Sequence, residues 1–143
     1  MTRIVICGGP RTGKTTLASA VAKEMWLVTP EPDIGERPDP AVRHSDDLIG
    51  TLDWSAASAK VATWLDGPGP WIIEGVALAR ALRKWREAHP GEPPPVDRVI
   101  RLTTPHVELS KGQAVMAKGE ATVWAEIEPW LSEHRIFAED PQK

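Results

Sequence analysis

Residues 4–15 read IVICGGPRTGKT, and this stretch decides the fold. The apolar run at residues 4–7 predicts a short buried strand. Three glycines among residues 8–13 predict a tight loop. Apolar residues then recur at helical spacing through residues 14–26. A strand, a glycine-rich loop and a helix therefore follow one another at the start of the chain.

The same residues match the pattern G-x-x-x-x-G-K-[ST], which is typical of the phosphate-binding P-loop. Backbone N–H groups in such a loop converge on an anion, and the helix adds the positive end of its dipole. Lys14 is expected to reach the β- and γ-phosphates, and the Thr15 hydroxyl to hold Mg²⁺. The expected nucleotide-binding residues are Gly8, Gly9, Pro10, Arg11, Thr12, Gly13, Lys14, Thr15 and Thr16.

The bulk composition limits the class of protein. A length of 143 residues suits one domain, so we expect a single domain over 1–143. The net charge of −3 excludes a global basic surface for nucleic acid but leaves a local basic patch open. The single Cys7 excludes an internal disulfide and a cysteine zinc site, and we expect it to be a buried small hydrophobe. Without a signal peptide or a membrane-spanning apolar run, a cytoplasmic protein, monomeric by default, is expected.

Strand and helix patterns alternate along the rest of the chain. The expected strands are 3–7, 41–44, 71–74, 96–102 and a short 135–138; the expected helices are 13–26, 54–65, 76–88, 105–118 and 122–131, the last disturbed at Pro129. Four prolines exclude regular structure from residues 29–40. This order predicts a three-layer α/β fold with a short, mostly parallel sheet of about four to five strands, covered on both faces. Residues 104–124 are expected to form a small helical lid.

Polar residues follow three of these strands, at residues 8–15, 45–47 and 74–75. Ligands of parallel sheets bind beyond the carboxyl ends of the strands. Asp46 is expected to act as a general base or as a ligand of a metal-bound water, with helix capping or a solvated acidic turn as the alternative. Glu74 ends an apolar strand and is expected to reach Mg²⁺ through water. Thr15, Asp46 and Glu74 are therefore the candidate metal residues.

Asp47, after the second strand, and five residues on the later helices are candidates for binding an acceptor. The helix residues are Arg80, Arg83, Lys84, Lys111 and Gln113. The three basic residues within 80–84 would suit a substrate phosphate or a nucleic-acid backbone, and a solvated helix face is the alternative. Lys118 and Lys111 are expected on the lid, where closure would exclude water; ordinary surface lysines are the alternative.

Three segments together resemble the small P-loop kinases, the group that holds nucleoside, nucleotide and polynucleotide kinases. They are residues 4–16, residues 44–47 and residues 71–75 with the basic helix that follows. Residues 44–47, His-Ser-Asp-Asp, look like the arrangement in uridine and nicotinamide-riboside kinases. Polynucleotide kinases carry a similar Asp-Asp whose first acid activates the acceptor hydroxyl, which implies that role for Asp46.

The resemblance implies a P-loop NTPase fold and a phosphotransferase that depends on Mg²⁺ and on ATP or another nucleoside triphosphate. The implied acceptor is a hydroxyl of a nucleoside-, nucleotide- or polynucleotide-like molecule, either a small molecule or a nucleic-acid end. Lys14, Asp46, Glu74 and Lys118 are the expected catalytic residues. Two alternatives stay open: a nucleotide-binding ATPase or switch without an acceptor, and a phage-type kinase acting on modified bases in DNA.

Overall fold

The computed structural model describes residues 2–28, 41–48 and 52–142. The elements in chain order are β1 (Arg3–Gly8), α1 (Lys14–Val28), β2 (Ala41–His44), η1 (Ser45–Leu48), α2 (Trp54–Trp64), β3 (Trp71–Gly75), α3 (Leu78–Ala88), β4 (Arg98–Leu102) and α4 (Lys111–Glu133). The proline-rich segment 29–40 lies outside the described residues. None of the described helices is long and apolar enough to cross a membrane.

The four described strands form one parallel sheet in the order β2-β3-β1-β4. β1 therefore lies in the interior of the sheet, between β3 and β4. All the carboxyl ends meet at one edge, so the loop after β1 adjoins the ends of its neighbours β3 and β4, and the end of β2 lies beyond that of β3. The expected α/β class and parallel sheet are confirmed, with four strands in the described part of the chain.

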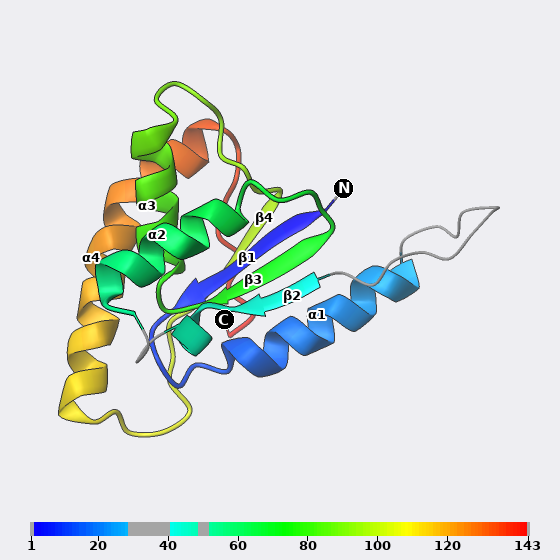
Figure 1. Cartoon of the computed structure of the whole chain (residues 1–143). Helices are drawn as coiled ribbons and strands as arrows, with labels where there is room; N and C mark the ends of the chain where they lie inside the picture. The colour runs from blue at the N-terminus through cyan, green and yellow to red at the C-terminus, as the bar shows by residue number, and fades with distance from the viewer. Residues whose placement is uncertain (1, 29–40, 49–51, 143) are drawn as a thin grey trace.

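Helices cover both faces of the sheet, as Figure 1 shows: α1 lies on one face, and α2, α3 and α4 lie on the other. Alternate residues of β1 point to opposite faces because side chains along a strand have a period of two. Ile4 and Ile6 pack with Ala18 and Val21 of α1. On the opposite face, residues from β1, β3 and β4 pack with α2, α3 and α4.

Cys7 belongs to that second face and is fully buried, which confirms the expectation of a small buried hydrophobe. Burial, followed by the charge of Glu120, raises the pKa of its thiol far above the ordinary value. The thiol is therefore unreactive at neutral pH.

The carboxyl-terminal third differs from the prediction. Residues 105–118 and 122–131 were expected as two helices, but α4 is one continuous helix that begins at Lys111 and includes Pro129. A capping box between Ser110 and Gln113 defines its start. Its buried side chains, among them Ile127 and Trp130, pack into the core and outweigh the cost of a proline inside the helix.

The short strand expected at 135–138 is also absent from the described chain. A single parallel bridge joins Glu139 to Ile100 instead. The residues expected as a lid, 104–124, form a connection without helix and then the first half of α4. This half is continuous with the half that packs in the core, so movement of a separate lid stays a prediction.

Candidate functional site

The loop between β1 and α1 is shaped by glycines at two close contacts. Gly8 has φ of 138°, and a Cβ there would overlap the carbonyl oxygen of Leu102. Gly13 has φ of 91°, and a Cβ there would overlap the ring of His106. Both backbone conformations favour glycine. The expected glycine positions are thus explained by the path of the loop, whatever it binds.

The start of α1 adjoins this loop. The first backbone hydrogen bond into the helix runs from Leu17 N to Gly13 O, at 3.0 Å. The N–H groups of the preceding residues, 14–16, have no acceptor within the helix because they lie in its first turn. The Thr12 hydroxyl donates to Gly9 O at 3.0 Å and closes the loop from inside. The loop is therefore followed directly by the N–H groups of the first turn of α1.

Lys14 lies inside that loop and is only 4% exposed. Its Nζ donates to Gly9 O at 2.7 Å and lies 3.5 Å from Thr12 Oγ1. Burial lowers the pKa of Lys14, while the charges of Asp46 and Glu74 oppose that shift. An ammonium group is thus held at the centre of the loop without an ion-pair partner within 4 Å among the described residues.

Glu74 is the penultimate residue of β3, and its side chain is buried. Thr15 Oγ1 donates to Glu74 Oε1 at 3.2 Å. His44 Nδ1 lies 2.7 Å from the same oxygen, where a ring N–H donates to the carboxylate. The other oxygen, Oε2, is buried and has no hydrogen-bond partner within the described chain. A buried carboxylate oxygen without a donor is an available ligand for a cation or its bound water.

Asp46 lies in η1, directly after β2. Its Oδ1 accepts a hydrogen bond from Val76 N at 3.3 Å, which ties η1 to the residue after β3. Gly75, the last residue of β3, has φ of 146°, and a Cβ there would overlap the hydroxyl of Ser45. Asp47, the next residue, is exposed. Only the first acid of the pair thus bonds to the end of β3.

The residues within 80–84, expected as a phosphate track, are separated by their contacts. Arg83 forms an ion pair with Glu126 of α4 at 3.1 Å, and Lys84 donates to Ser55 of α2 at 3.1 Å. Arg80 instead has its guanidinium carbon 5.8 Å from the centroid of the Trp54 ring. Only Arg80 points toward the end of β3, where it lines a cavity with Val76.

The candidate residues on α4 also differ from one another in their surroundings. Gln113 is half of the capping box: its side chain accepts from Ser110 N at 2.9 Å, and its own N–H donates to Ser110 Oγ at 3.2 Å. These hydrogen bonds give Gln113 a structural role at the start of α4, and its expected role in substrate binding stays a prediction. Lys111 and Lys118 are exposed. Two of the remaining candidates near the loop differ in exposure: Pro10 is buried and Thr16 is exposed. The backbone of Arg11 has φ of 61°.

Three features of the site were not predicted. No partner was predicted for His44, whose Nδ1 lies 2.7 Å from Glu74 Oε1. The parallel register, which pairs His44 with Glu74, is the signal that would have found this contact. The backbone N–H of His106 donates to Arg11 O at 2.7 Å, and the His106 ring lies against Gly13. No sequence pattern brings these residues together.

The third feature is a buried ion pair beneath the loop. Arg101 of β4 and Glu120 of α4 approach to 2.6 Å between Nη2 and Oε1. An arginine that stands between the apolar residues Ile100 and Leu102 of a strand signals such a partner. On the same helix, Ala117 lies beside Gly9, where a Cβ would be 3.1 Å from the alanine methyl. The pair therefore holds α4 against the loop.

The residues present fit a magnesium ion that brings most of its own ligands. No group of three or more His, Cys, Asp or Glu side chains within the described ranges could hold a metal alone. Mg²⁺ usually binds proteins through one or two side chains and keeps water and phosphate oxygens as its other ligands. The Thr15 hydroxyl and the unpartnered Glu74 Oε2 supply such a pair, beside the ammonium of Lys14.

In comparisons with known proteins, no family model matches the chain and no curated protein matches it. The function is therefore inferred from the site.

Proposed function

We propose that the protein is a P-loop phosphotransferase that uses ATP and Mg²⁺ to phosphorylate a hydroxyl of a nucleoside-, nucleotide- or polynucleotide-like acceptor. One observation carries the proposal: Lys14, Thr15, Glu74 and Asp46, from the ends of three strands, surround one site. The carboxyl edge of a parallel sheet, where the loop follows an interior strand, is a usual place for nucleotide binding.

Each side chain has a role in this proposal that follows from its position. The loop N–H groups and Lys14 would bind the triphosphate and neutralise the charge that develops during transfer. Thr15 and Glu74 would hold Mg²⁺, which would supply positive charge to the phosphate groups when bound. Asp46 would take the proton of the acceptor hydroxyl. The hydroxyl oxygen forms a bond to the γ-phosphorus, the bond to the β–γ bridging oxygen breaks, and ADP leaves.

The direct test is transfer of labelled γ-phosphate from ATP across nucleosides, nucleoside monophosphates and oligonucleotide ends. Lys14→Ala is expected to reduce turnover by at least about a hundredfold, the effect of removing one preorganised charge-stabilising group. Lys23→Ala, on the exposed part of α1, is the matched control and should leave turnover unchanged. Transfer that survives both Lys14→Ala and Asp46→Asn would refute the proposal.

A second function, ATP binding or hydrolysis without an acceptor, is favoured by one contact. The hydrogen bond from Val76 N gives Asp46 a structural role that needs no substrate. In that case Asp46→Asn should leave ATP hydrolysis unchanged, because an amide oxygen can still accept from Val76. A kinase should instead lose acceptor phosphorylation in this variant while it retains ATP binding.

A kinase acting on bases within DNA has weaker support. Arg83 and Lys84 are occupied by Glu126 and Ser55, so these cations do not form a continuous track for a backbone. Binding to a DNA duplex that weakened steeply with salt would favour this acceptor nonetheless.

A further inference from the structure

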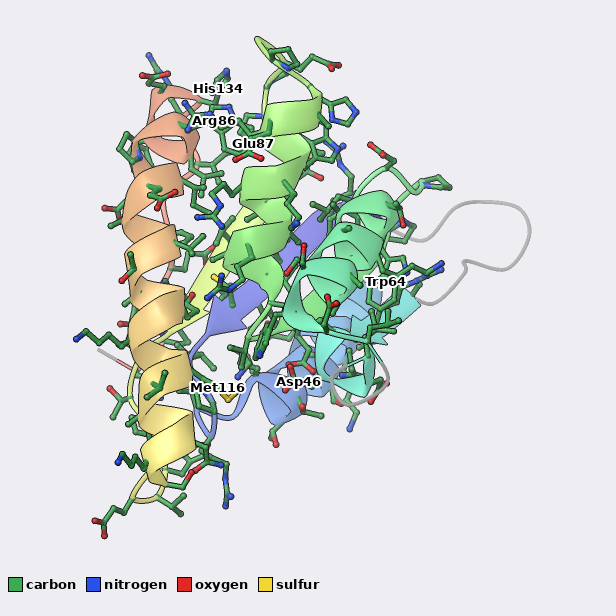
Figure 2. All side chains as sticks on the ribbon, turned by 60° about the vertical axis from the view of Figure 1, so that its left-hand side comes forward. Asp46, Trp64, Arg86, Glu87, Met116 and His134 are labelled. Atoms are coloured by element: carbon green, nitrogen blue, oxygen red, sulfur yellow. The ribbon has the colours of Figure 1, made fainter. Side chains whose placement is uncertain are left out.

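A small cavity lies between α2, α3 and α4, beside the end of β3. Its volume is about 120 Å³, and its lining residues are Trp54, Val76, Arg80, Val115, Met116 and Glu120. Val76 connects it to the site, because the Val76 N–H donates to Asp46 Oδ1 at 3.3 Å. Figure 2 shows Met116 on α4 and Asp46 on η1 at the same end of the molecule. The cavity therefore adjoins the proposed base, on the side away from α1.

The walls of this cavity suit a flat apolar ring. Trp54 presents an aromatic ring, Met116 a thioether, and Val76 and Val115 aliphatic groups. Aromatic faces and thioethers make favourable contacts with other rings. An engineered apolar cavity of about 150 Å³ holds one benzene molecule. At about 120 Å³, this cavity is close in size to one that holds a single six-membered ring, and two fused rings would extend beyond it.

Arg80 gives the cavity its polar contact. Its guanidinium lies over Trp54, and a Cβ added to Gly119 would be only 3.1 Å from Arg80 Nη2. Within residues 2–28, 41–48 and 52–142, no carboxylate forms an ion pair with Arg80. The cavity's own acid, Glu120, is bound to Arg101. The N–H donors of Arg80 are therefore available to an oxygen acceptor on the occupant.

We propose that this cavity binds the ring of the phosphate acceptor and that the acceptor is a pyrimidine nucleoside or nucleotide. This inference rests on the proposed kinase function, which makes the acceptor a nucleoside or nucleotide. The size of the cavity then favours bases with one ring over bases with two. The ring packs between Trp54 and Met116, and a ring carbonyl oxygen accepts from Arg80. Purine nucleosides should bind more weakly because their second ring extends beyond the cavity.

Calorimetry tests the binding of uridine, cytidine and thymidine against adenosine and guanosine, with and without a non-hydrolysable Mg²⁺–ATP analogue. Pyrimidine nucleosides should bind at least about tenfold more tightly than purine nucleosides. Arg80→Gln should weaken pyrimidine binding about tenfold or more, the effect of losing a hydrogen bond from a charged group. The affinity for the ATP analogue should stay within about twofold.

Arg43→Gln is the matched control. Arg43 also lies over a tryptophan, at 5.1 Å from the Trp64 ring, but outside the cavity. This variant should change neither affinity. Gly119→Ala is a second test that retains every side chain of the wall. Its methyl group must displace the Arg80 guanidinium, so pyrimidine binding should weaken severalfold while the helix content is unchanged.

Three outcomes would overturn the cavity assignment: purines bind as tightly as pyrimidines, no nucleoside binds, or neither Arg80→Gln nor Gly119→Ala changes pyrimidine binding. These outcomes are independent of catalysis. If pyrimidines bind as expected but no phosphate is transferred, the kinase proposal fails and the cavity assignment stands. If purine acceptors are phosphorylated as well as pyrimidines, the kinase proposal stands and the cavity assignment fails.

Discussion

The buried ion pair between Arg101 and Glu120 allows a quantitative test of how α4 is held beside the loop. The Arg101 Nη2 and Glu120 Oε1 atoms are 2.6 Å apart, and Arg101 Nε lies 3.4 Å from Oε2. The side chains are 16% and 1% exposed. The guanidinium also lies over Trp124, with its carbon 5.1 Å from the ring centroid.

Arg101→Met would retain an unbranched side chain against Trp124 but leave the Glu120 carboxylate buried without its counterion. Breaking a buried pair in this way costs about 3–5 kcal/mol of unfolding free energy. For a chain of this length, the loss corresponds to a decrease in melting temperature of roughly 10 °C. Combining Arg101→Met with Glu120→Leu removes both charges, so the double variant should be within about 1 kcal/mol of the original protein or more stable.

Urea unfolding at pH 7, followed by tryptophan fluorescence, measures these differences. Arg83→Met is the control, because the Arg83–Glu126 pair also joins an arginine to α4 but is exposed, and it should cost less than about 1 kcal/mol. Two results would refute the reasoning: an Arg101→Met variant as stable as the original protein, or a double variant less stable than the single one.

Two further predictions concern the site itself. Gly75→Ala should reduce the unfolding free energy by at least about 2 kcal/mol, because a Cβ at φ of 146° is strained and also overlaps the Ser45 hydroxyl. Urea unfolding measures it, and a change below about 0.5 kcal/mol would contradict the close packing of η1 on β3. The second concerns pH. Burial lowers the pKa of Lys14 below its ordinary value of 10.5, so over the interval between the folded pKa and 10.5 the unfolded chain binds more protons. The stability of the ligand-free protein should therefore rise with pH across this interval, whereas triphosphate binding should weaken as Lys14 loses its proton. Lys14→Met should abolish both trends in thermal unfolding and in calorimetric titration, and trends that persist in this variant would belong to another group.

Local patterns were enough to predict most of the elements. The strand at 41–44 and the helix that begins at Trp54 agree with the prediction because their signals lie within a few residues. The convergence of Thr15 and Glu74 was expected for a related reason. Parallel strands place their carboxyl ends together, so residues distant in sequence meet at one edge.

The errors arise where a distant partner overrides a local signal. Pro129 predicted a disturbed helix, but burial of the neighbouring side chains keeps α4 continuous. Arg80 and Arg83 share a helix and a charge, and their separate roles depend on which residue of α2 or α4 lies opposite each. Nothing in a single helix specifies those neighbours.

By itself, the sequence determined the parallel α/β architecture, the glycine loop before α1 and the acids that end two strands. These follow from periodicity and backbone conformation, which are properties of contiguous residues. Only the tertiary structure decided that His44 binds Glu74, that His106 covers Gly13 and that Arg80 alone faces a cavity beside Asp46. The physical reason is that a side chain's hydrogen bonds and ion pairs depend on the element packed against it, and packing joins residues across the whole chain.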